Sequence, residues 1–523
     1  MRAAVAIAAV FALAPVGADA AYRRCHESTF YEGCECRGYL PGRDQTVIPS
    51  SHPSRPELCN LINLQTAFEY AVDAAGNGLT VALARGSRYP LSAPVYRFDG
   101  PEVVEVVNDG RIRAQAHGQR WTSIGAGPYP RVSLPPFAGY DEHQPAGCRG
   151  ELPDDKEEPQ DPRGPRNPRI PPCRRFPTHQ IGLFDATGYR VTIEYHELDG
   201  GLDPACAPRM PPFPGSRRDV DRHGLVELGW SAEASGTIFH DNVVRNVVGW
   251  TALHLGEGRL GADGVPSCRD VEVYGNTFEN LGYSLCDPAT DANGVSRECY
   301  WGDAISLACT GSVRNNRIRN PTDVGIVAFV GGVAIEGNVI SSDRSKAFGG
   351  IVAVDEFRRE DGTWVANHDA TVIAGNTIRA DAGGGFDVGI GLGSLTWTCA
   401  AQVQPTFAAS LVVANRIEAA GGRINYGLAV TLADGVSDDG LRVGSARVCG
   451  RGGCADAPFP NAFVGTFGGG PPGLGCSGQP AGPPYPYIVN SCARCWLQDG
   501  YAQGSDYRHL LHGVAPVNPP ACH

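Results

Sequence analysis

One short phrase recurs along the middle of the chain: an Asn, any residue, then a large apolar residue. Clear copies begin at Asn276, Asn316, Asn338, Asn376 and Asn415, and a degraded copy begins at Asn242. A second phrase, a Gly followed by Ile or Leu, comes 9 to 13 residues after each of the last four Asn residues, at Gly325, Gly350, Gly389 and Gly427. Two short strands separated by a turn and repeated in this way are typical of a solenoid, whose rungs stack on one another.

Stacking turns equivalent positions of successive rungs into columns, because parallel strands lie about 4.8 Å apart. Asn side chains in an inward column can hydrogen-bond from rung to rung, as stacked Asn side chains do in other β stacks. We therefore expect a structural ladder formed by Asn276, Asn316, Asn338, Asn376 and Asn415. The Ile and Val residues of both phrases are expected to form the core.

Composition and net charge exclude several classes of protein for this chain. Hydrophobic residues make up 42% of the 523 residues and charged residues 19%, which is enough apolar material for a sizeable core. The net charge of −12 leaves no basic stripe for a nucleic-acid partner. After the N-terminus, no segment approaches the ~20 apolar residues of a membrane span. Only Lys156 and Lys346 are lysines, so a catalytic Lys is nearly excluded.

The N-terminus and the cysteines indicate an oxidising compartment. Residues 1–20 combine a basic start, a short apolar run and Ala18-Asp19-Ala20, the pattern of a secretory signal peptide. All 18 Cys residues follow it, which is typical of a disulfide framework in a secreted protein, extracellular or periplasmic. Cys449 and Cys454 look like a local staple, as do Cys286 and Cys299, but the sequence does not settle the pairing.

Four regions follow from these patterns. Residues 21–62 are a Cys-rich N-terminal segment, and Asn63 is expected to cap a helix from Leu64 to Ala75 that covers the open end of the solenoid. Residues 445–523 form a terminal cap rich in Cys, Gly and Pro. The solenoid occupies residues 63–444 and is expected to be monomeric, with inserted loops at 141–178, 203–218, 286–300, 355–368 and 395–407.

The helix before the first strand and the repeated Asn and Gly-Ile phrases together resemble the right-handed parallel β-helix proteins, the pectate-lyase-like superfamily. The likeness covers roughly residues 60–440. It implies an all-β fold, a right-handed parallel β-helix solenoid with an N-terminal capping helix and Cys/Pro/Gly-rich ends. It implies little about function, because this scaffold carries lyases, hydrolases, epimerases, phage tailspikes and inert surface proteins.

Acidic residues recur beside the second strand of the repeat. Asp323 and Asp387 stand in matching Asp-Val-Gly-Ile phrases, and Asp303 precedes Ala304-Ile305. Stacking would place Asp303 and Asp323 roughly 5 Å apart, a spacing that suits a retaining glycosidase, although their offsets from the following Ile differ by one residue. Asp355 and Glu356 are candidate metal ligands. No cofactor is required by these motifs, and calcium is the cation that such carboxylates would bind.

Each of these residues also has a structural interpretation. An Asp before a strand often accepts backbone hydrogen bonds in a turn. His254 alternates with Leu253 and Leu255 and is expected to face outward, as a surface His or as a catalytic group. Arg319 is either a solvated strand residue or a cation that neutralises a substrate carboxylate. Sugar stacking and apolar anchoring of loops are both open for Tyr300, Trp301 and Trp397.

The sequence thus favours a secreted protein that binds an acidic polysaccharide. Where it also cleaves the polymer, a lyase is favoured over a glycoside hydrolase. The alternative is a non-catalytic surface, adhesion or structural protein. Polygalacturonase activity is not predicted. The phrases at Asn320–Ile326 and Gly302–Ile305 echo that family in reversed order, with Ala304 in place of its second Asp, and no Gly-His-Gly follows. Convergence of Asp303 and Asp323 with a basic residue in an open groove would favour the enzyme.

Overall fold

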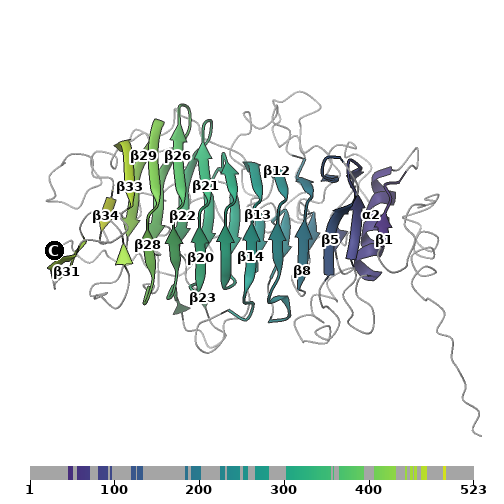
Figure 1. Ribbon diagram of the computed structural model, residues 1–523, viewed down its shortest axis with the longest axis horizontal. Coiled ribbons are helices and arrows are strands. Elements are labelled where there is room, and N and C mark those ends of the chain that lie inside the picture. The colour runs from purple at the N-terminus through teal and green to yellow at the C-terminus, as the bar shows by residue number, and fades with distance from the viewer. Residues whose placement is uncertain are drawn as a thin grey trace, which may run out of the picture.

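The computed structural model describes the central part of the chain almost continuously and the two ends in pieces. The described residues are 45–50, 56–70, 80–91, 95–96, 119–124, 127–133, 183–185, 190–201, 224–229, 232–247, 251–256, 266–281, 302–354, 357–358, 364–393, 406–430, 442–443, 448–450, 453–455, 461–467 and 487–489. These residues are almost entirely β, with strands stacked side by side along the long axis of the molecule (Figure 1).

The described strands form two large parallel sheets. The first has 11 strands: β1 (Gln45–Val47), β2 (Thr80–Ala84), β5 (Gln119–Ile124), β8 (Val191–Glu194), β11 (Ile238–His240), β14 (Val271–Tyr274), β17 (Gly311–Arg314), β20 (Val333–Glu336), β25 (Val372–Ala374), β28 (Leu411–Val413) and β30 (Arg442–Val443). The second has 19 strands and consists of two ladders that share the long strand β29 (Arg416–Val430).

The ladder containing the Asn phrases is β3 (Arg88–Pro90), β6 (Arg131–Ser133), β9 (Glu197–Asp199), β12 (Val243–Val247), β15 (Thr277–Leu281), β18 (Arg317–Arg319), β21 (Val339–Ser342), β26 (Thr377–Asp381), β29 and β33 (Ala462–Phe467). The ladder containing the Gly phrases is β4 (Val95–Tyr96), β7 (Phe184–Asp185), β10 (Val226–Leu228), β13 (Thr251–Leu255), β16 (Asp303–Leu307), β19 (Val324–Ala328), β22 (Lys346–Ala353), β27 (Gly385–Leu392), β29 and β34 (Tyr487–Val489).

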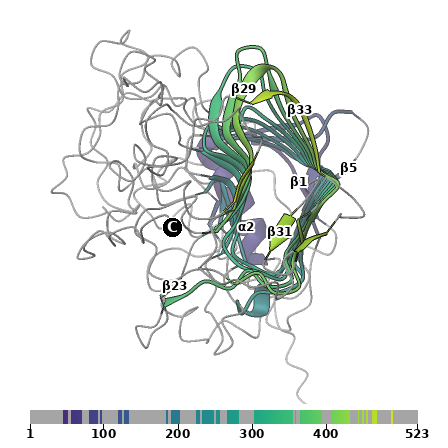
Figure 2. The ribbon, with the colours of Figure 1, turned by 90° about the vertical axis from the view of Figure 1, so that its left-hand side faces the viewer.

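Each rung in the central part therefore contributes one strand to the first sheet and one to each ladder of the second, as in β14, β15 and β16. Viewed along the stack, the ribbons of successive rungs superimpose around a common interior (Figure 2). This arrangement is compatible with the β-helix-like fold that the repeats predict. The sequence motifs identified two strands per rung, whereas the structure has three.

The corner between the first sheet and the Asn ladder explains the Asn phrase. A residue with positive φ stands before each ladder residue from Asn242 to Asn415, for example Asn315 at 54° before Asn316 and Gly375 at 64° before Asn376. The Asn side chains then bond from rung to rung, with Nδ2–Oδ1 distances of 2.9–3.2 Å. The ladder runs through Asn242, Asn276, Asn316, Asn338, Asn376, Asn415 and Asn461.

The Gly column is required by close packing rather than by unusual backbone angles. A Cβ on Gly350 would lie 2.6 Å from the carbonyl oxygen of Gly389 and 2.7 Å from Cγ2 of Ile378. A Cβ on Gly325 or on Gly389 would meet the equivalent Gly carbonyl oxygen and Ile side chain of the next rung. At these positions the Gly ladder lies so close to the next rung and to the Ile side chains of the Asn ladder that only Gly fits without a shift of its neighbours.

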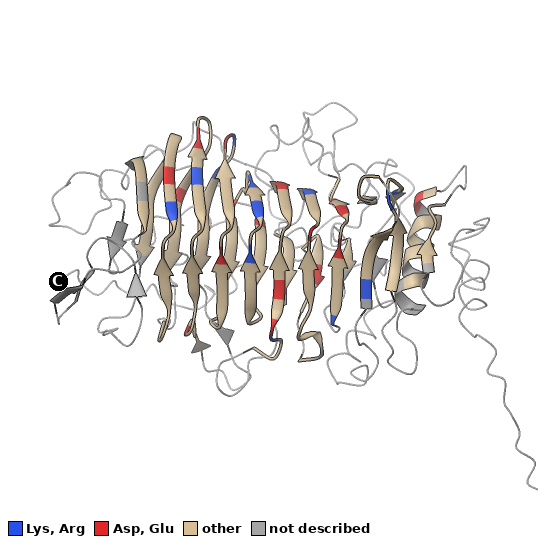
Figure 3. Ribbon diagram, in the orientation of Figure 1, with Lys and Arg blue, Asp and Glu red and all other residues tan. Residues whose placement is uncertain are grey.

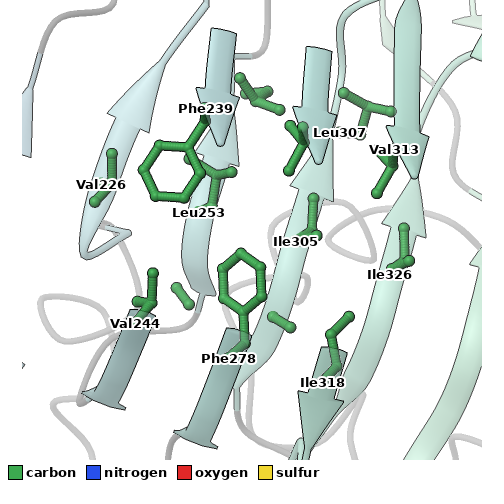
Figure 4. Packing of buried hydrophobic residues seen from close by; sticks show 14 of the residues in the cluster. Val226, Phe239, Val244, Leu253, Phe278, Ile305, Leu307, Val313, Ile318 and Ile326 are labelled. Atoms are coloured by element: carbon green, nitrogen blue, oxygen red, sulfur yellow. The ribbon is translucent and has the colours of Figure 1, made fainter. Parts of the chain in front are cut away.

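Columns of apolar residues from all three strands of each rung fill the interior. Ile305 is level with Ile326, while Phe278 is level with Ile318. These side chains are fully or almost fully buried, and Figure 4 shows those of neighbouring strands converging on the same interior. Burial of each such side chain contributes roughly 1.5–3 kcal/mol.

The helix predicted from Leu64 begins earlier than the sequence suggested. It is α2 (Pro56–Tyr70), with Pro56 in the first turn and Asn63 buried inside the helix rather than capping it. Pro is favoured at the first helical position because its missing N–H needs no partner there, and Glu57 follows it. Leu64 and Ala67 pack into the core, and α2 contacts β1, β3 and β4 at one end of the stack (Figure 1).

The described residues also contain two short antiparallel pairs and a disulfide bond between two core strands' flanking cysteines. The pairs are β23 (Phe357–Arg358) with β24 (Trp364–Val365), and β31 (Val448–Gly450) with β32 (Gly453–Ala455), which sets Cys449 opposite Cys454. Cys268 and Cys309 are bonded, with their Cα atoms 5.1 Å apart. Within the described residues, no helix has the length and apolarity to cross a bilayer. The expected signal peptide, the Cys286–Cys299 pair and the loops at 141–178, 203–218 and 286–300 lie outside the described residues.

Candidate functional site

Asp303 and Asp323 lie on neighbouring rungs of the Gly ladder, in or just before strands β16 and β19. The register sets Ile305 beside Ile326, so Asp303 is level with Val324 and Asp323 stands one residue earlier. This is the offset expected from the sequence. The Asp303 carboxylate links the two rungs, because its Oδ1 accepts a hydrogen bond from the backbone N–H of Val324 at 3.0 Å.

The other oxygen of Asp303 ends a chain of hydroxyl groups. Asp303 Oδ2 lies 2.9 Å from Ser306 Oγ. Ser306 Oγ lies 3.0 Å from Thr251 Oγ1. Thr251 Oγ1 in turn lies 3.1 Å from the Leu253 carbonyl oxygen. Ser306 and Thr251 have one hydroxyl proton each, so these two protons cannot make hydrogen bonds in all three contacts at once. When Asp303 is ionised, Ser306 donates to Asp303 Oδ2 and Thr251 donates to the Leu253 carbonyl oxygen. A proton on Asp303 Oδ2 would instead be donated to Ser306, whose own proton is then free for Thr251.

The electrostatic setting favours that protonated form. Both carboxyl groups are buried, with Asp303 3% and Asp323 2% exposed. Burial and the neighbouring charge of Asp323 raise the pKa of Asp303 well above its usual value, while hydrogen bonds from Ser306 and Val324 act in the opposite direction. Two carboxyl groups this close resist double ionisation.

His254 lies on β13, one rung before Asp303, but not on an open surface. Its neighbours Leu253 and Leu255 belong to the core, so its side chain faces away from the core as the alternation predicts. It is nevertheless only 4% exposed, and the expectation of a surface His is wrong. It is level with Glu227 and Ser306, and its Nδ1 lies 3.6 Å from Glu227 Oε2, too long for a hydrogen bond.

Asp387 occupies the same column as Asp323, two rungs farther along the axis. Val324, Gly349 and Val388 are level, so the residues before them, Asp323, Phe348 and Asp387, stack in order. Two rungs correspond to about 10 Å. Burial raises the pKa of Asp387 to about 7, against the opposing effects of Arg423 and of a hydrogen bond from Asn425.

Arg319 lies in the other ladder and forms an ion pair with Asp343, with Nε 3.1 Å from Asp343 Oδ2. Its side chain is 59% exposed, in agreement with the solvated alternative, and no described contact joins it to Asp303 or Asp323. Tyr300, Trp301, Trp397, Asp355 and Glu356 lie outside the described residues. Within the described residues, no group of three or more His, Cys, Asp or Glu side chains is placed to hold a metal ion.

The sequence analysis missed a polar cluster on the first sheet. His240 binds Asp241 through Nδ1 at 2.8 Å and Glu194 through Nε2 at 2.7 Å. Its ring stacks on Tyr274 with centroids 4.7 Å apart, and the Arg314 guanidinium lies over Tyr274. The His240 nitrogens and the faces of Tyr274 are thus occupied by protein groups, which indicates that the cluster stabilises the fold. These residues are neighbours only because of the strand register, and no motif in the sequence predicts that they lie together.

Charges of both signs are interspersed along the described strands (Figure 3). The Asp303–Asp323 pair differs from these surface charges because both of its carboxyl groups are buried. Such a pair can hold one proton and exchange it, which is the basis of general acid–base chemistry. Comparisons with protein-family models, with curated proteins and with solved structures found no match to this chain.

Proposed function

We propose that this chain is a secreted, monomeric, right-handed β-helix protein of the pectate-lyase-like kind, capped by α2, that cleaves an acidic polysaccharide. Asp303 supplies the proton and Asp323 acts as the base or nucleophile. The observation that carries the proposal is the buried pair on adjacent rungs, with the pKa of Asp303 raised well above its usual value. A raised pKa keeps an acid protonated where ordinary Asp side chains are ionised.

The reaction within this proposal is hydrolysis rather than elimination, which reverses the order favoured by the sequence. An elimination needs a cation or metal to neutralise the substrate carboxylate next to the base. The described contacts of Asp303 are Ser306, Val324 and Asp323, none of them cationic. Asp303 and Asp323 lie on adjacent rungs, about 4.8 Å apart along the axis and offset by one residue, and the Asp323 charge acts on Asp303, which fits the short separation of a retaining pair better than that of an inverting pair.

The test is a panel of pectate, alginate and glycosaminoglycan digestions, with and without calcium. Released reducing ends measure hydrolysis, and ultraviolet absorbance of unsaturated uronates measures elimination. Asp303→Asn and Asp323→Asn should each lower the rate about 100-fold or more. The matched control is Asp343→Asn, which changes a carboxylate on the other ladder. No product from any polymer, or equal rates in all variants, would refute the proposal.

A second candidate function is a non-catalytic scaffold. The observation that favours it is that Asp303 binds the backbone of the next rung while both carboxyl groups are almost fully buried. In that case Asp303→Asn would lower thermal stability, and the native protein would release neither reducing ends nor unsaturated uronates from any polymer of the panel.

A further inference from the structure

Thr251, Ser306 and Asp303 form a buried chain of polar side chains across two neighbouring rungs. Thr251 on β13 is level with Asp303 on β16, and all three side chains are at most 3% exposed. Ser306 Oγ lies between the other two, 2.9 Å from Asp303 Oδ2 and 3.0 Å from Thr251 Oγ1. The chain ends at the Leu253 carbonyl oxygen, which can only accept a hydrogen bond.

The side chains at both ends of this chain are fixed in orientation. Asp303 Oδ1 accepts a hydrogen bond from the backbone N–H of Val324, which leaves Oδ2 directed toward Ser306. A Cβ on Gly224 would lie 2.9 Å from Cγ2 of Thr251, so the Thr251 methyl group packs against a residue that has no side chain. A β-branched side chain has few χ1 rotamers, and the rotamer present here places Thr251 Oγ1 next to Ser306.

Ser306 and Thr251 favour different charge states of Asp303. Ser306 has one proton and gives it to Asp303 when that carboxyl group is ionised, so Ser306 alone stabilises the ionised form. Thr251 Oγ1 accepts the Ser306 proton only when Asp303 is protonated and donates to Ser306 itself. The hydrogen bond from Thr251 to Leu253 is available in both states and cancels. Thr251 therefore adds one hydrogen bond to the protonated form that the ionised form lacks.

We infer that Thr251 is a positioning residue that keeps the proton of the Asp303–Asp323 pair on Asp303, acting through Ser306. Protonated Asp303 donates to Ser306, Ser306 donates to Thr251, and the last hydrogen bond of the chain goes to the Leu253 carbonyl oxygen. This inference rests on the proposed function, in which Asp303 is the acid, and gives a physical reason why the two carboxyl groups have different roles.

Titratable side chains on the neighbouring rungs also act on Asp303. Burial and the charge of Asp323, on the next rung, raise its pKa. His254 is level with Ser306 on the preceding rung, and Glu227 is level with His254 one rung farther along. Substitutions of the two hydroxyl side chains leave all of these titratable groups in place, so a change in the protonation of Asp303 reports on the hydroxyl chain.

Infrared spectroscopy of the full chain measures the protonation of Asp303 without any substrate. Buried carboxylic acids keep their C=O band at pH values where exposed Asp and Glu are ionised. The band that is lost in Asp303→Asn but kept in Asp387→Asn belongs to Asp303. At a fixed pH within its titration, Thr251→Val should lower the ratio of protonated to ionised Asp303 about fivefold, the effect of one neutral hydrogen bond. Thr251→Ala should lower the ratio as much, whereas Thr251→Ser keeps the hydroxyl group and should stay within about twofold of the native protein.

Two further variants separate this effect from a general loss of packing. Thr237→Val removes another fully buried hydroxyl group, which accepts from the Val191 N–H in the first sheet, and should leave the ratio within about twofold. In Ser306→Ala the chain is interrupted, so the addition of Thr251→Val should change the ratio by less than about twofold. Melting temperatures show whether each variant is folded.

An unchanged ratio in Thr251→Val, an equal change in Thr237→Val, or a full effect of Thr251→Val in the Ser306→Ala background would overturn the inference. Where a polymer is cleaved, the alkaline limb of the pH profile of kcat/KM should move to lower pH in Thr251→Val, which a purely structural role of Thr251 would not produce. A lowered ratio in a protein that cleaves no polymer means that the inference stands and the catalytic proposal fails. Cleavage with an unchanged ratio is the reverse outcome.

Discussion

At the scale of single residues, the Asn ladder is the most demanding feature of the fold. Asn316 Oδ1 accepts from the backbone N–H and the side chain of Asn276, at 3.0 and 2.9 Å. Its Nδ2 donates to Asn338 and to the Val273 carbonyl. All of these groups are buried, so removal of one amide leaves several partners without hydrogen bonds.

Asn316→Ala should therefore lower the free energy of unfolding by about 3 kcal/mol or more, since each buried unsatisfied group costs about 1–3 kcal/mol. Urea unfolding followed by circular dichroism measures the loss. Arg317→Ala, the exposed next residue, should change stability by no more than about 0.5 kcal/mol. Equal effects of the two substitutions would mean that the ladder contributes little.

The buried acid Asp387 makes stability depend on pH. Its pKa is about 7 in the folded chain and about 3.9 in the unfolded chain, so the folded state binds more protons between these values. Stability should fall as pH rises from about 4 to 7, by an amount of the order of 4 kcal/mol from this group. In Asp387→Asn the fall should be smaller, which melting temperatures from pH 4 to 8 would reveal. Identical profiles would contradict the assignment.

At the scale of elements, two kinds of Gly meet different demands within one rung. A Cβ on Gly350 would lie 2.6–2.7 Å from the Gly389 carbonyl oxygen and from Ile378 Cγ2, whereas a Cβ on Gly375 would meet nothing within 4 Å. Gly375 is needed only for its φ of 64°, a region that Asn tolerates, as Asn315 shows at the equivalent corner. Gly350→Ala should thus destabilise the protein by about 2 kcal/mol or more, and Gly375→Asn by less than about 1 kcal/mol. Denaturant midpoints compare them, and similar losses would refute this distinction.

The same contrast explains how far the sequence could predict the fold. The Asn and Gly columns were predictable because rung geometry favours those residues there, although Ala304 stands level with Gly325 one rung earlier. The ladder also includes Asn461, and Asn461-Ala-Phe463 carries the same phrase, so this copy could have been recognised. Strands such as β17 could not be recognised from the sequence, because no single residue type is required at their outward positions.

Less of the candidate site was predictable. Asp303 and Asp323 stand beside Ile residues that align, so their proximity follows from the repeat. The contact of Lys346 with Asp387 does not, because it depends on side chains meeting across rungs at different positions of their strands. The burial of His254 is a tertiary property too, since alternation gives the direction of a side chain but not what covers it.

At the scale of the whole molecule, stacking makes residues far apart in sequence into neighbours. Val339 and Thr377 are partners on adjacent rungs although 38 positions separate them, and Val339 is 40% exposed. Adjacent strands lie about 4.8 Å apart, within the 4.4–6.8 Å between Cα atoms that a disulfide spans. The double variant Val339→Cys with Thr377→Cys should therefore form a disulfide, detected as a linked peptide by mass spectrometry.

Thr277 belongs to the same column, but three rungs separate it from Thr377. Three rungs correspond to about 14 Å, beyond the reach of a disulfide. Thr277→Cys with Thr377→Cys should therefore remain unlinked. This pair controls for random oxidation, since it presents Cys on the same face of the same ladder. A link in the distant pair, or none in the adjacent pair, would show that the rungs are not stacked in this register, and the proximity of Asp303 to Asp323 would fail with it.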